Sequence, residues 1–291
     1  MTQEAIFSDA TQWGYFLEFE DVARTSLAAL GELHASGRLA GGVVAFGPDC
    51  WRQAGPDWTP EGFAAFEPVT GPNHAAPATQ RDLLVWLRND DQNALFDDAR
   101  AVTEALAPYA RLADATFGFD YRDSHDLIGF EDGTGNPKGD ARRDAALVPV
   151  GSTGAGGAFV FTQKWQHDLK AFNALDVAAQ ERVVGRTKAD SIELTGDAMP
   201  ATSHVSRTDL KVDGVAQKIF RRSMPYGDPA THGLFFIAFA CEQSRVQVQL
   251  DSMYDVSHSG VQDALLDFSQ AVSGAYWFAP AADVLAAMLK S

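Results

Sequence analysis

The sequence predicts an α+β protein made of duplicated ferredoxin-like modules, with two antiparallel sheets, helices outside them and a barrel-like arrangement of the dimeric α+β kind. Three observations support this prediction. The 291 residues suit two domains of about 140 residues each. A β-α-β-β-α-β order of hydrophobic patterns occurs twice along the chain. An irregular, glycine-rich region lies between the two copies. We therefore place one module at 1–150 and the other at 151–291.

The first half alternates strand-like and helix-like patterns. The run GYFLEFE is rich in aromatic and apolar residues, as strands are, and the apolar residues after it recur at helical spacing. GVVAF and DLLVWL are further short β-type runs, and TFGFDY alternates aromatic with small or polar residues. In chain order we expect a strand at Gly14–Glu20, a helix at Asp21–Ser36, strands at Gly42–Phe46 and Asp82–Leu87, a helix at Gln92–Ala110 and a strand at Thr116–Tyr121.

The second half repeats this order, with one ambiguity. The segment Ser244–Met253 is interpreted as a helix, although the alternation in VQVQL fits a strand equally well. The other patterns are continuous apolar runs or helical repeats. We expect a strand at Gly157–Trp165, a helix at Asp168–Val184, strands at Lys218–Met224 and Leu234–Ala240, and a last strand at Ala275–Phe278.

The composition is that of an acidic globular protein. Hydrophobic residues make up 46% and charged residues 21%, which is enough apolar material for a core. A formal charge of -16 would repel nucleic acid and anionic membranes, so we expect neither as a partner. Cys50 and Cys241 have no C-x-x-C spacing, and no run reaches the ~20 apolar residues of a membrane span. Since the first residues carry no export signal, we expect a cytoplasmic protein.

The stretch GFEDGTGNP, at Gly129–Pro137, sets two acids between glycines. Glycines allow a sharp turn or a close approach of the backbone, so the acids are held at fixed positions in a tight loop. An acidic surface turn and a functional loop both fit this pattern. The irregular regions around 123–156 and 185–215 are each about 30 residues long and hold many His, Asp and Arg residues, and loops of that length are usually functional or disordered.

The seven histidines give no zinc pattern. No two of them stand four residues apart on a helix, and there is no H-E-x-x-H, so a site that needs only one histidine remains, of which haem iron is the common case. His204, in PATSHVSRTDL, is such a candidate, although a capping or surface histidine fits equally. Arg221 and Arg222 follow an apolar strand. Since adjacent strand residues face opposite sides, only one of the two arginines can enter a pocket.

Several of these segments, in this order, resemble the dye-decolourising haem peroxidases. GFEDGTGNP matches their G-x-x-D-G signature, and GAFVFTQKW, ERVVGRTK, SHVSRTDL, RRSMPYG, THGLFF and AYWFAP follow. The resemblance covers nearly the whole chain and is closest to the compact bacterial B-type members. It implies a cytoplasmic peroxidase with haem b (iron protoporphyrin IX), which reduces hydrogen peroxide through a ferryl porphyrin-radical intermediate and oxidises dyes, phenols or similar small organic reductants. It also implies a homo-oligomer.

The resemblance also implies roles for individual residues. It makes His204 the proximal iron ligand, Asp132 the distal acid, with Gly133 beside the cofactor, and Arg221 the distal arginine. The second module is expected to provide most haem contacts. Ser223 occupies a position where some members have asparagine, and Arg186, in GRTK, is a candidate partner for a haem propionate. A surface ion pair is the alternative for Arg186.

Two other functions remain open from the sequence. A haem-handling or haem-carrier protein would need only His204 and a pocket, whereas a peroxidase also needs the acid and the arginine. A haem-free ferredoxin-like binding module would need none of these. Aromatic residues could relay electrons from a reductant to the haem, although core packing explains them equally. The candidates by residue type are Trp165, Tyr226, Tyr254 and Trp277.

Overall fold

Eight strands from both halves of the chain form one antiparallel sheet that closes on itself. The computed structural model describes residues 1–290, so the last residue of the predicted second module lies outside it. The sheet closes because β12 pairs with β7 on one side and with β11 on the other. In spatial order the barrel strands are β11 (Met224–Gly227), β6 (Arg111–Phe119), β1 (Trp13–Glu20), β5 (Leu83–Asn89), β2 (Val43–Phe46), β14 (Ala275–Ala279), β7 (Ala158–His167) and β12 (His232–Ala240).

The barrel corrects the expectation of two separate sheets. Strands from the two halves meet at two seams, where Tyr226 of β11 pairs with Gly118 of β6 and Phe278 of β14 pairs with Phe46 of β2. Two open sheets would each leave strands with unpaired backbone groups at their edges, and closure pairs these groups. The predicted α+β class is confirmed, and the predicted strands all lie within or beside this one sheet.

The predicted strand at Lys218–Met224 is interrupted in the structure. Phe220–Arg221 forms β10, which pairs with β12 in the same alignment as β11, because Phe220 lies opposite Phe239 and Met224 opposite Phe235. The two short strands therefore form one line with a break between them. A further strand, β13 (Ser269–Ala271), pairs with the end of β7.

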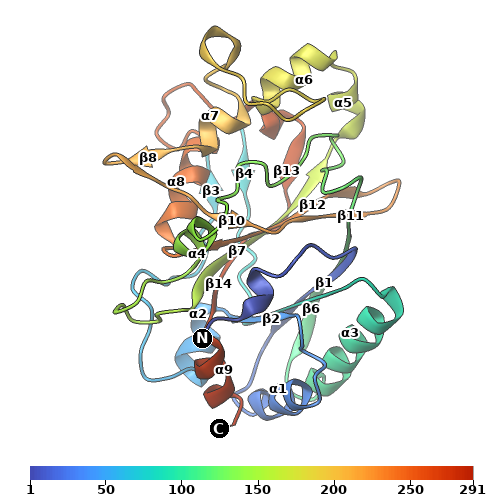
Figure 1. Cartoon of the computed structure of the whole chain (residues 1–291), viewed down its shortest axis with the longest axis vertical. Coiled ribbons are helices and arrows are strands. Elements are labelled where there is room, and N and C mark those ends of the chain that lie inside the picture. The colour runs from blue at the N-terminus through green and yellow to red at the C-terminus, as the bar shows by residue number, and fades with distance from the viewer. Residues whose placement is uncertain (291) are drawn as a thin grey trace.

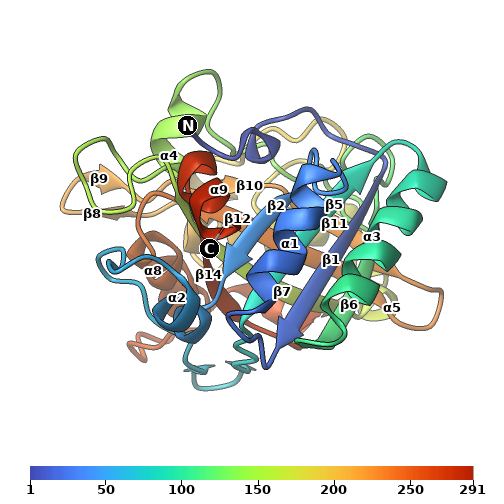
Figure 2. The same cartoon turned by 90° about the horizontal axis from the view of Figure 1, so that it is seen from below.

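Helices of the first half cover one part of the sheet (Figure 2). α1 (Ser26–Ala35) and α3 (Gln92–Leu106) pack their apolar faces against the outer side of the strands of this half. α1 begins later than expected because Asp21 has a positive φ of 56°, outside the helical region. α3 begins at Asp91, whose side chain accepts hydrogen bonds from the amides of Asn93 and Ala94, and it ends just before Pro108.

The second-half helices between residues 169 and 253 lie towards the other end of the molecule (Figure 1), whereas the last helix, at Ala282–Met288, packs in the same core cluster as α1. The single helix expected at 168–184 is two helices, α5 (Leu169–Asn173) and α6 (Val177–Val184), because Asp176 is extended and caps α6 through the amide of Ala179. Ser244–Met253 is the helix α8, as interpreted. Val246, Gln249, Leu250 and Met253 are its buried residues, which is a helical spacing.

Short elements were missed because they carry too few residues for a periodic pattern. These comprise four helices, two small hairpins and three 3₁₀ turns. They are α2 (Pro48–Ala54), α4 (Ala141–Ala146), α7 (His204–Thr208), α9 (Ala282–Met288), β3 (Val69–Thr70) with β4 (Ala75–Ala76), β8 (Lys211–Val212) with β9 (Val215–Ala216), η1 (Glu4–Ile6), η2 (Gly196–Ala198) and η3 (Ala264–Asp267).

The strand β7 separates two environments. Val160 packs into the barrel interior with buried aromatic residues of both halves, such as Trp86 and Trp277. The alternate side chains, including Phe161 and Trp165, lie on the outer face below the second group of helices. None of the helices formed by residues 1–290 has the length and apolar character needed to cross a membrane.

Candidate active site

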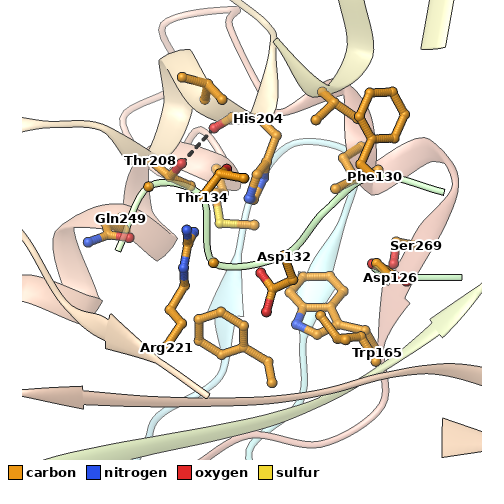
Figure 3. A pocket seen from close by; sticks show the side chains of 18 of the residues that line it. Asp126, Phe130, Asp132, Thr134, Trp165, His204, Thr208, Arg221, Gln249 and Ser269 are labelled. Atoms are coloured by element: carbon orange, nitrogen blue, oxygen red, sulfur yellow. Dashed lines mark hydrogen bonds between the residues drawn. The ribbon is translucent and has the colours of Figure 1, made fainter. Parts of the chain in front are cut away.

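A large cavity lies between the outer face of β7 and β12 and the helices α7 and α8. Apolar side chains form most of its walls, and the loop at 128–135 lies along one side (Figure 3). The cavity is lined by five of the six residues singled out from the sequence, namely Asp132, Gly133, Arg186, His204 and Arg221. Residues far apart in the chain therefore meet at one site.

His204 is the first residue of α7, and its ring points into the cavity. The helix begins here because the hydroxyl of Ser203 accepts a hydrogen bond from the amide of Ser206. The imidazole Nδ1 of His204 lies 2.7 Å from Oδ2 of Asp263. A carboxylate at this distance favours the tautomer with the proton on Nδ1, which leaves the other nitrogen, Nε2, as the one able to bind a metal.

Asp263 is a site residue that the sequence analysis missed. Its side chain is fully buried, and its second oxygen, Oδ1, accepts a hydrogen bond from the amide of Leu265 at 2.9 Å, which holds it at the start of η3. The separation of 59 residues from His204 leaves no spacing signal in the sequence. Only the helix-capping chemistry of an aspartate could have drawn attention to it.

The glycine-rich loop holds Asp132 at the cavity and leaves Glu131 exposed. The amide of Asp132 donates a 2.8 Å hydrogen bond to the carbonyl of Ser124, and Gly133 has a φ of 82°, which favours glycine. The side chains of Asp132 and Arg221 approach the cavity from the side opposite His204 (Figure 3). Glu131 also borders the cavity, but it is exposed, whereas Asp132 is half-buried.

The two adjacent arginines point in opposite directions, as the strand pattern predicts. Arg221 lines the cavity, whereas Nη1 of Arg222 donates hydrogen bonds to the carbonyls of Ile6 at 2.9 Å and Ser8 at 2.7 Å. Burial, together with the nearby Arg142, lowers the pKa of Arg222 to about 10. Arg222 therefore fastens the first residues of the chain to the barrel.

Asn136 joins the loop to Arg221. Its side-chain Nδ2 donates to the carbonyl of Arg221 at 2.8 Å, and its Oδ1 accepts from the amide of Arg221 at 2.9 Å. A Cβ atom on Gly135 would lie 3.3 Å from Nη2 of Arg221, so the guanidinium passes close to the loop backbone. The sequence analysis treated this asparagine only as part of the motif.

Ser223 lies beside the main cavity instead of lining it. It faces an adjoining cavity that it shares with Asp132 and Arg221. Its hydroxyl is buried and has no hydrogen-bond partner among residues 1–290. An unpaired buried hydroxyl is available to bind a water or a small polar molecule on this side of Asp132.

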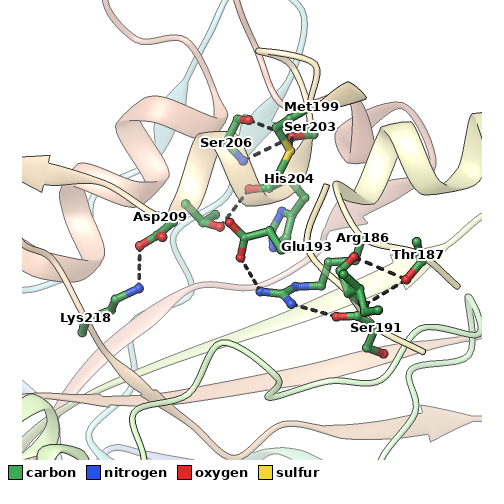
Figure 4. A network of polar contacts seen from close by, with 12 residues as sticks. Arg186, Thr187, Ser191, Glu193, Met199, Ser203, His204, Ser206, Asp209 and Lys218 are labelled. Carbon is green, nitrogen blue, oxygen red and sulfur yellow. Dashed lines mark hydrogen bonds and ion pairs between the residues drawn. The ribbon is translucent and has the colours of Figure 1, made fainter. Parts of the chain in front are cut away.

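Arg186 forms the ion pair considered from the sequence and also lies at the cavity. It lines the cavity, and its Nη2 also pairs with Glu193 at 2.8 Å while Nη1 donates to the carbonyl of Ser191 at 2.9 Å (Figure 4). Its side chain is 18% exposed. A guanidinium held in this way keeps its charge fixed at the rim of the cavity.

A second polar group at the cavity wall also escaped the sequence analysis. The ring of His167 lies between Asp126, 3.0 Å from Nε2, and Ser269, 2.6 Å from Nδ1, and all three residues are buried. They line the same cavity as His204. Within residues 1–290 no group of three or more His, Cys, Asp or Glu side chains could hold a metal ion. Any metal at this site would therefore need additional ligands besides protein side chains.

Two family models together match most of the chain. The N-terminal model of the Dyp-type peroxidases matches residues 23–120, and the C-terminal model matches residues 123–284. The chain belongs to the Dyp-type peroxidase family. The loop with Asp132, the histidine at 204 and both arginines fall within the C-terminal match.

Curated relatives carry the name dye-decolorizing peroxidase. The protein from Mycobacterium tuberculosis is 37% identical over 84% of this chain and 74% of its own length. The protein from Rhodococcus erythropolis is 37% identical over 84% of this chain and 72% of its own length. These relatives therefore align with most of the chain described here.

Solved Dyp-type structures share the whole fold. DyPB from Rhodococcus jostii RHA1 superposes with a TM-score of 0.91 at 33% identity, covering 98% of both chains. The dye-decolorizing protein from Vibrio cholerae gives 0.89 at 36% identity, covering 97% of this chain and 98% of its own. Variants of the Rhodococcus jostii protein were solved in complex with haem.

Proposed function

We propose that this Dyp-type peroxidase binds haem b in the cavity at His204, reduces hydrogen peroxide there and oxidises small organic reductants such as dyes and phenols. One observation carries the proposal: the ring of His204 points into a cavity that Asp132 and Arg221 also line, and its Nδ1 is held by Asp263. A lone imidazole is sufficient for haem iron, because the porphyrin supplies the other four ligands in its plane.

The residues of the cavity fit this cofactor. Phe161, Phe236 and Leu250 provide apolar walls for a flat macrocycle, and Arg186 at the rim provides a cation for a propionate. Gly133 lets the loop backbone approach the cofactor closely, since it carries no side chain. When bound, the haem iron supplies the site that activates peroxide. The remaining chemistry belongs to the side chains.

Asp132 and Arg221 would handle the proton and the charge. Peroxide must lose a proton to bind as hydroperoxide, and the carboxylate of Asp132 can accept it directly or through a water. Cleavage of the O–O bond leaves negative charge on the departing oxygen, and the guanidinium of Arg221 stabilises it. Ser223, with its unpaired hydroxyl next to Asp132, would hold a water or the incoming peroxide.

A haem carrier is the weaker candidate. Such a protein would need His204 and the apolar walls, but it would have no use for an acid and a guanidinium that approach the cavity from the side opposite His204. No ion pair formed by residues 1–290 involves Arg221, so this cation is not neutralised by a protein carboxylate as a structural arginine usually is. The arrangement favours turnover over transport.

The proposal is tested by absorption spectra of the purified, haem-loaded protein before and after one equivalent of peroxide. We expect a Soret band that shifts within seconds for the wild type. Asp132→Asn and Arg221→Leu should keep the Soret band and slow the shift, with a loss on the order of 10²–10³ for Arg221→Leu if it acts as an oxyanion donor. His204→Ala should bind haem poorly. A carrier would give a Soret band that peroxide does not shift in any of these proteins.

We also propose that the two halves are copies of one ferredoxin-like module, at 1–150 and 151–291. The support is their strand order, which is β6-β1-β5-β2 in the first half and β14-β7-β12-β11 in the second, so that the first and third strands are central in both. A cytoplasmic location and a homo-oligomer remain proposals. Support for the first is that Cys50 and Cys241 are both free thiols. Sedimentation of the haem-loaded protein would test the second.

A further inference from the structure

Asn136 pairs with the backbone of Arg221 as a neighbouring strand would. One side-chain amide satisfies both the N–H and the C=O of that residue, at 2.9 and 2.8 Å. On its other side Arg221 pairs with Ala238 of β12. Asn136 therefore pairs with an edge of β10 that has no neighbouring strand. The next strand of the barrel, β6, pairs only with Tyr226 of β11 and does not reach β10.

The same residue closes the turn that carries Asp132. The amide of Asn136 donates to the carbonyl of Gly133 at 2.9 Å, and Gly133 takes a positive φ to make that turn. At its other end the loop is fixed by the hydrogen bond from the amide of Asp132 to Ser124. Asp132 is therefore connected to Arg221 by one short turn and by the two hydrogen bonds of the Asn136 side chain.

The guanidinium end of Arg221 is restricted by the same loop. Gly135 lies so close to Nη2 of Arg221 that an added Cβ atom would be 3.3 Å away. The loop consequently bonds the backbone of Arg221 through Asn136 and passes close to its head group at Gly135. A shift of the loop would move the acid and the arginine relative to each other.

We propose that Asn136 is a positioning residue that sets the placement of Arg221 relative to Asp132. This inference rests on the proposed roles of those two residues in the reaction with peroxide. Stabilisation of a developing charge requires a donor that is already in place, and a displacement of about 1 Å can cost about 100-fold in rate. Asn136 touches neither substrate nor cofactor in this proposal and acts only through Arg221.

A double-mutant cycle tests the coupling. The bimolecular rate of the peroxide-induced spectral shift is measured for wild type, Asn136→Ala, Arg221→Leu and the double variant. We expect Asn136→Ala to lower the rate about 10- to 100-fold in the wild-type background and less than about threefold in the Arg221→Leu background, because residues that act through one another are not additive. The haem content and the wavelength of the resting Soret band should stay unchanged.

A measurement on the haem-free protein tests the contact itself. Hydrogen exchange of the Arg221 amide should accelerate in Asn136→Ala, because this N–H loses its acceptor. Asn136→Asp has the same shape and keeps an acceptor for the Arg221 amide, but it sets an oxygen against the Arg221 carbonyl, so we expect slow exchange and an intermediate peroxide rate. Asn93→Ala is the control, since Asn93 is exposed on α3 and lines neither cavity. It should match wild type in both measurements.

The outcomes separate this inference from the proposed function. If Arg221→Leu reacts with peroxide as fast as wild type, the proposed role of Arg221 fails. If Arg221→Leu is slow but Asn136→Ala is as fast as wild type, only the positioning role fails. An equal fractional loss in both backgrounds would also overturn the positioning role, because Asn136 would then act independently of Arg221.

Discussion

At the scale of single residues, the contact between His204 and the buried Asp263 is the best-defined feature of the site. Asp263 has no exposed surface, and its other oxygen is held by the amide of Leu265. A buried carboxylate on Nδ1 makes the imidazole a stronger electron donor and fixes its orientation. These two effects set both the affinity for iron and the electron density on it.

We therefore expect Asp263→Asn to weaken haem binding about 10- to 100-fold and to raise the Fe(III)/Fe(II) reduction potential. The change removes the negative charge and keeps the shape. Haem titration of the apoprotein and a potentiometric titration of the loaded protein measure the two quantities. Asp98→Asn is a matched control, because Asp98 of α3 pairs with Arg38 and does not line the cavity. Equal potentials in wild type and Asp263→Asn would contradict this role.

A second buried acid, Glu18 of β1, makes stability depend on pH. Burial, with a further contribution from Asp114, raises its pKa from 4.5 to about 7, although Arg81 and Lys164 oppose the shift. Between pH 4.5 and about 7 the folded state therefore keeps the proton on Glu18, whereas the unfolded state has released it. Stability is highest at or below pH 4.5 with respect to this group, and it falls as the pH rises towards 7.

We predict that Glu18→Gln removes this part of the pH dependence. A pKa raised to about 7 corresponds to about 3 kcal/mol, so the variant should match wild type near pH 5 and exceed its free energy of unfolding by up to about 3 kcal/mol near pH 8. Denaturant titrations of both proteins across this range measure the difference. A difference that stays constant with pH would show that Glu18 does not titrate in this interval.

At the scale of the element, two tasks are divided between Arg221, the last residue of β10, and Arg222, which follows it. Arg221 is directed at the cavity, and Arg222 holds the segment after η1 through backbone carbonyls. We expect Arg222→Met to lower the free energy of unfolding by about 1–3 kcal/mol, since the carbonyls of Ile6 and Ser8 lose their charged donor. Its peroxide reaction should stay within about threefold of wild type. Arg221→Met should give the opposite pattern, and the same pattern for both variants would refute the division.

The opposite directions of Arg221 and Arg222 could be predicted from the sequence, because the alternation of side chains along a strand depends only on neighbouring residues. Asp132 and His204 were identified through the family resemblance, and the structure places both at one cavity. Other contacts could not be predicted. Asp263 is 59 residues from His204 and Asn136 is 85 residues from Arg221, and no periodic pattern connects positions so far apart. The break between α5 and α6 escaped notice because apolar spacing continues across it.

Closure of the barrel was likewise beyond local patterns. It depends on pairing between β6 and β11 and between β2 and β14, whose sequences say nothing about each other. Strand patterns predict that a strand exists, whereas its partner is chosen by the whole chain. The expectation of two sheets was therefore the natural result of treating each half alone.

At the scale of the whole molecule, the barrel interior is a core shared by both halves. The rings of Phe16 in β1 and Phe235 in β12 stack with centroids 3.9 Å apart, and the tilted rings of Trp86 and Phe239 have centroids 5.9 Å apart. Each half thus completes the core of the other. We expect neither half to unfold without the other, despite their similar strand order.

Phe235→Ala should accordingly lower the free energy of unfolding by about 3–5 kcal/mol in one transition. Far-ultraviolet circular dichroism and tryptophan fluorescence are followed in the same denaturant series, and their midpoints should shift together. Phe96→Ala is the control, because Phe96 is 54% exposed and its loss should cost no more than about 0.5 kcal/mol. Separate midpoints for the two probes would mean that the halves unfold independently.

The two-faced strand β7 limits how this chain can change in length. Val160 belongs to the barrel interior, and Phe161 and Trp165 belong to the cavity wall. One inserted residue before Phe161 would exchange the two sets, sending cavity residues into the barrel and barrel residues towards the cofactor. Insertions and deletions should therefore be tolerated in the exposed connections and excluded from this strand, which a library of single-residue insertions selected for haem retention would reveal.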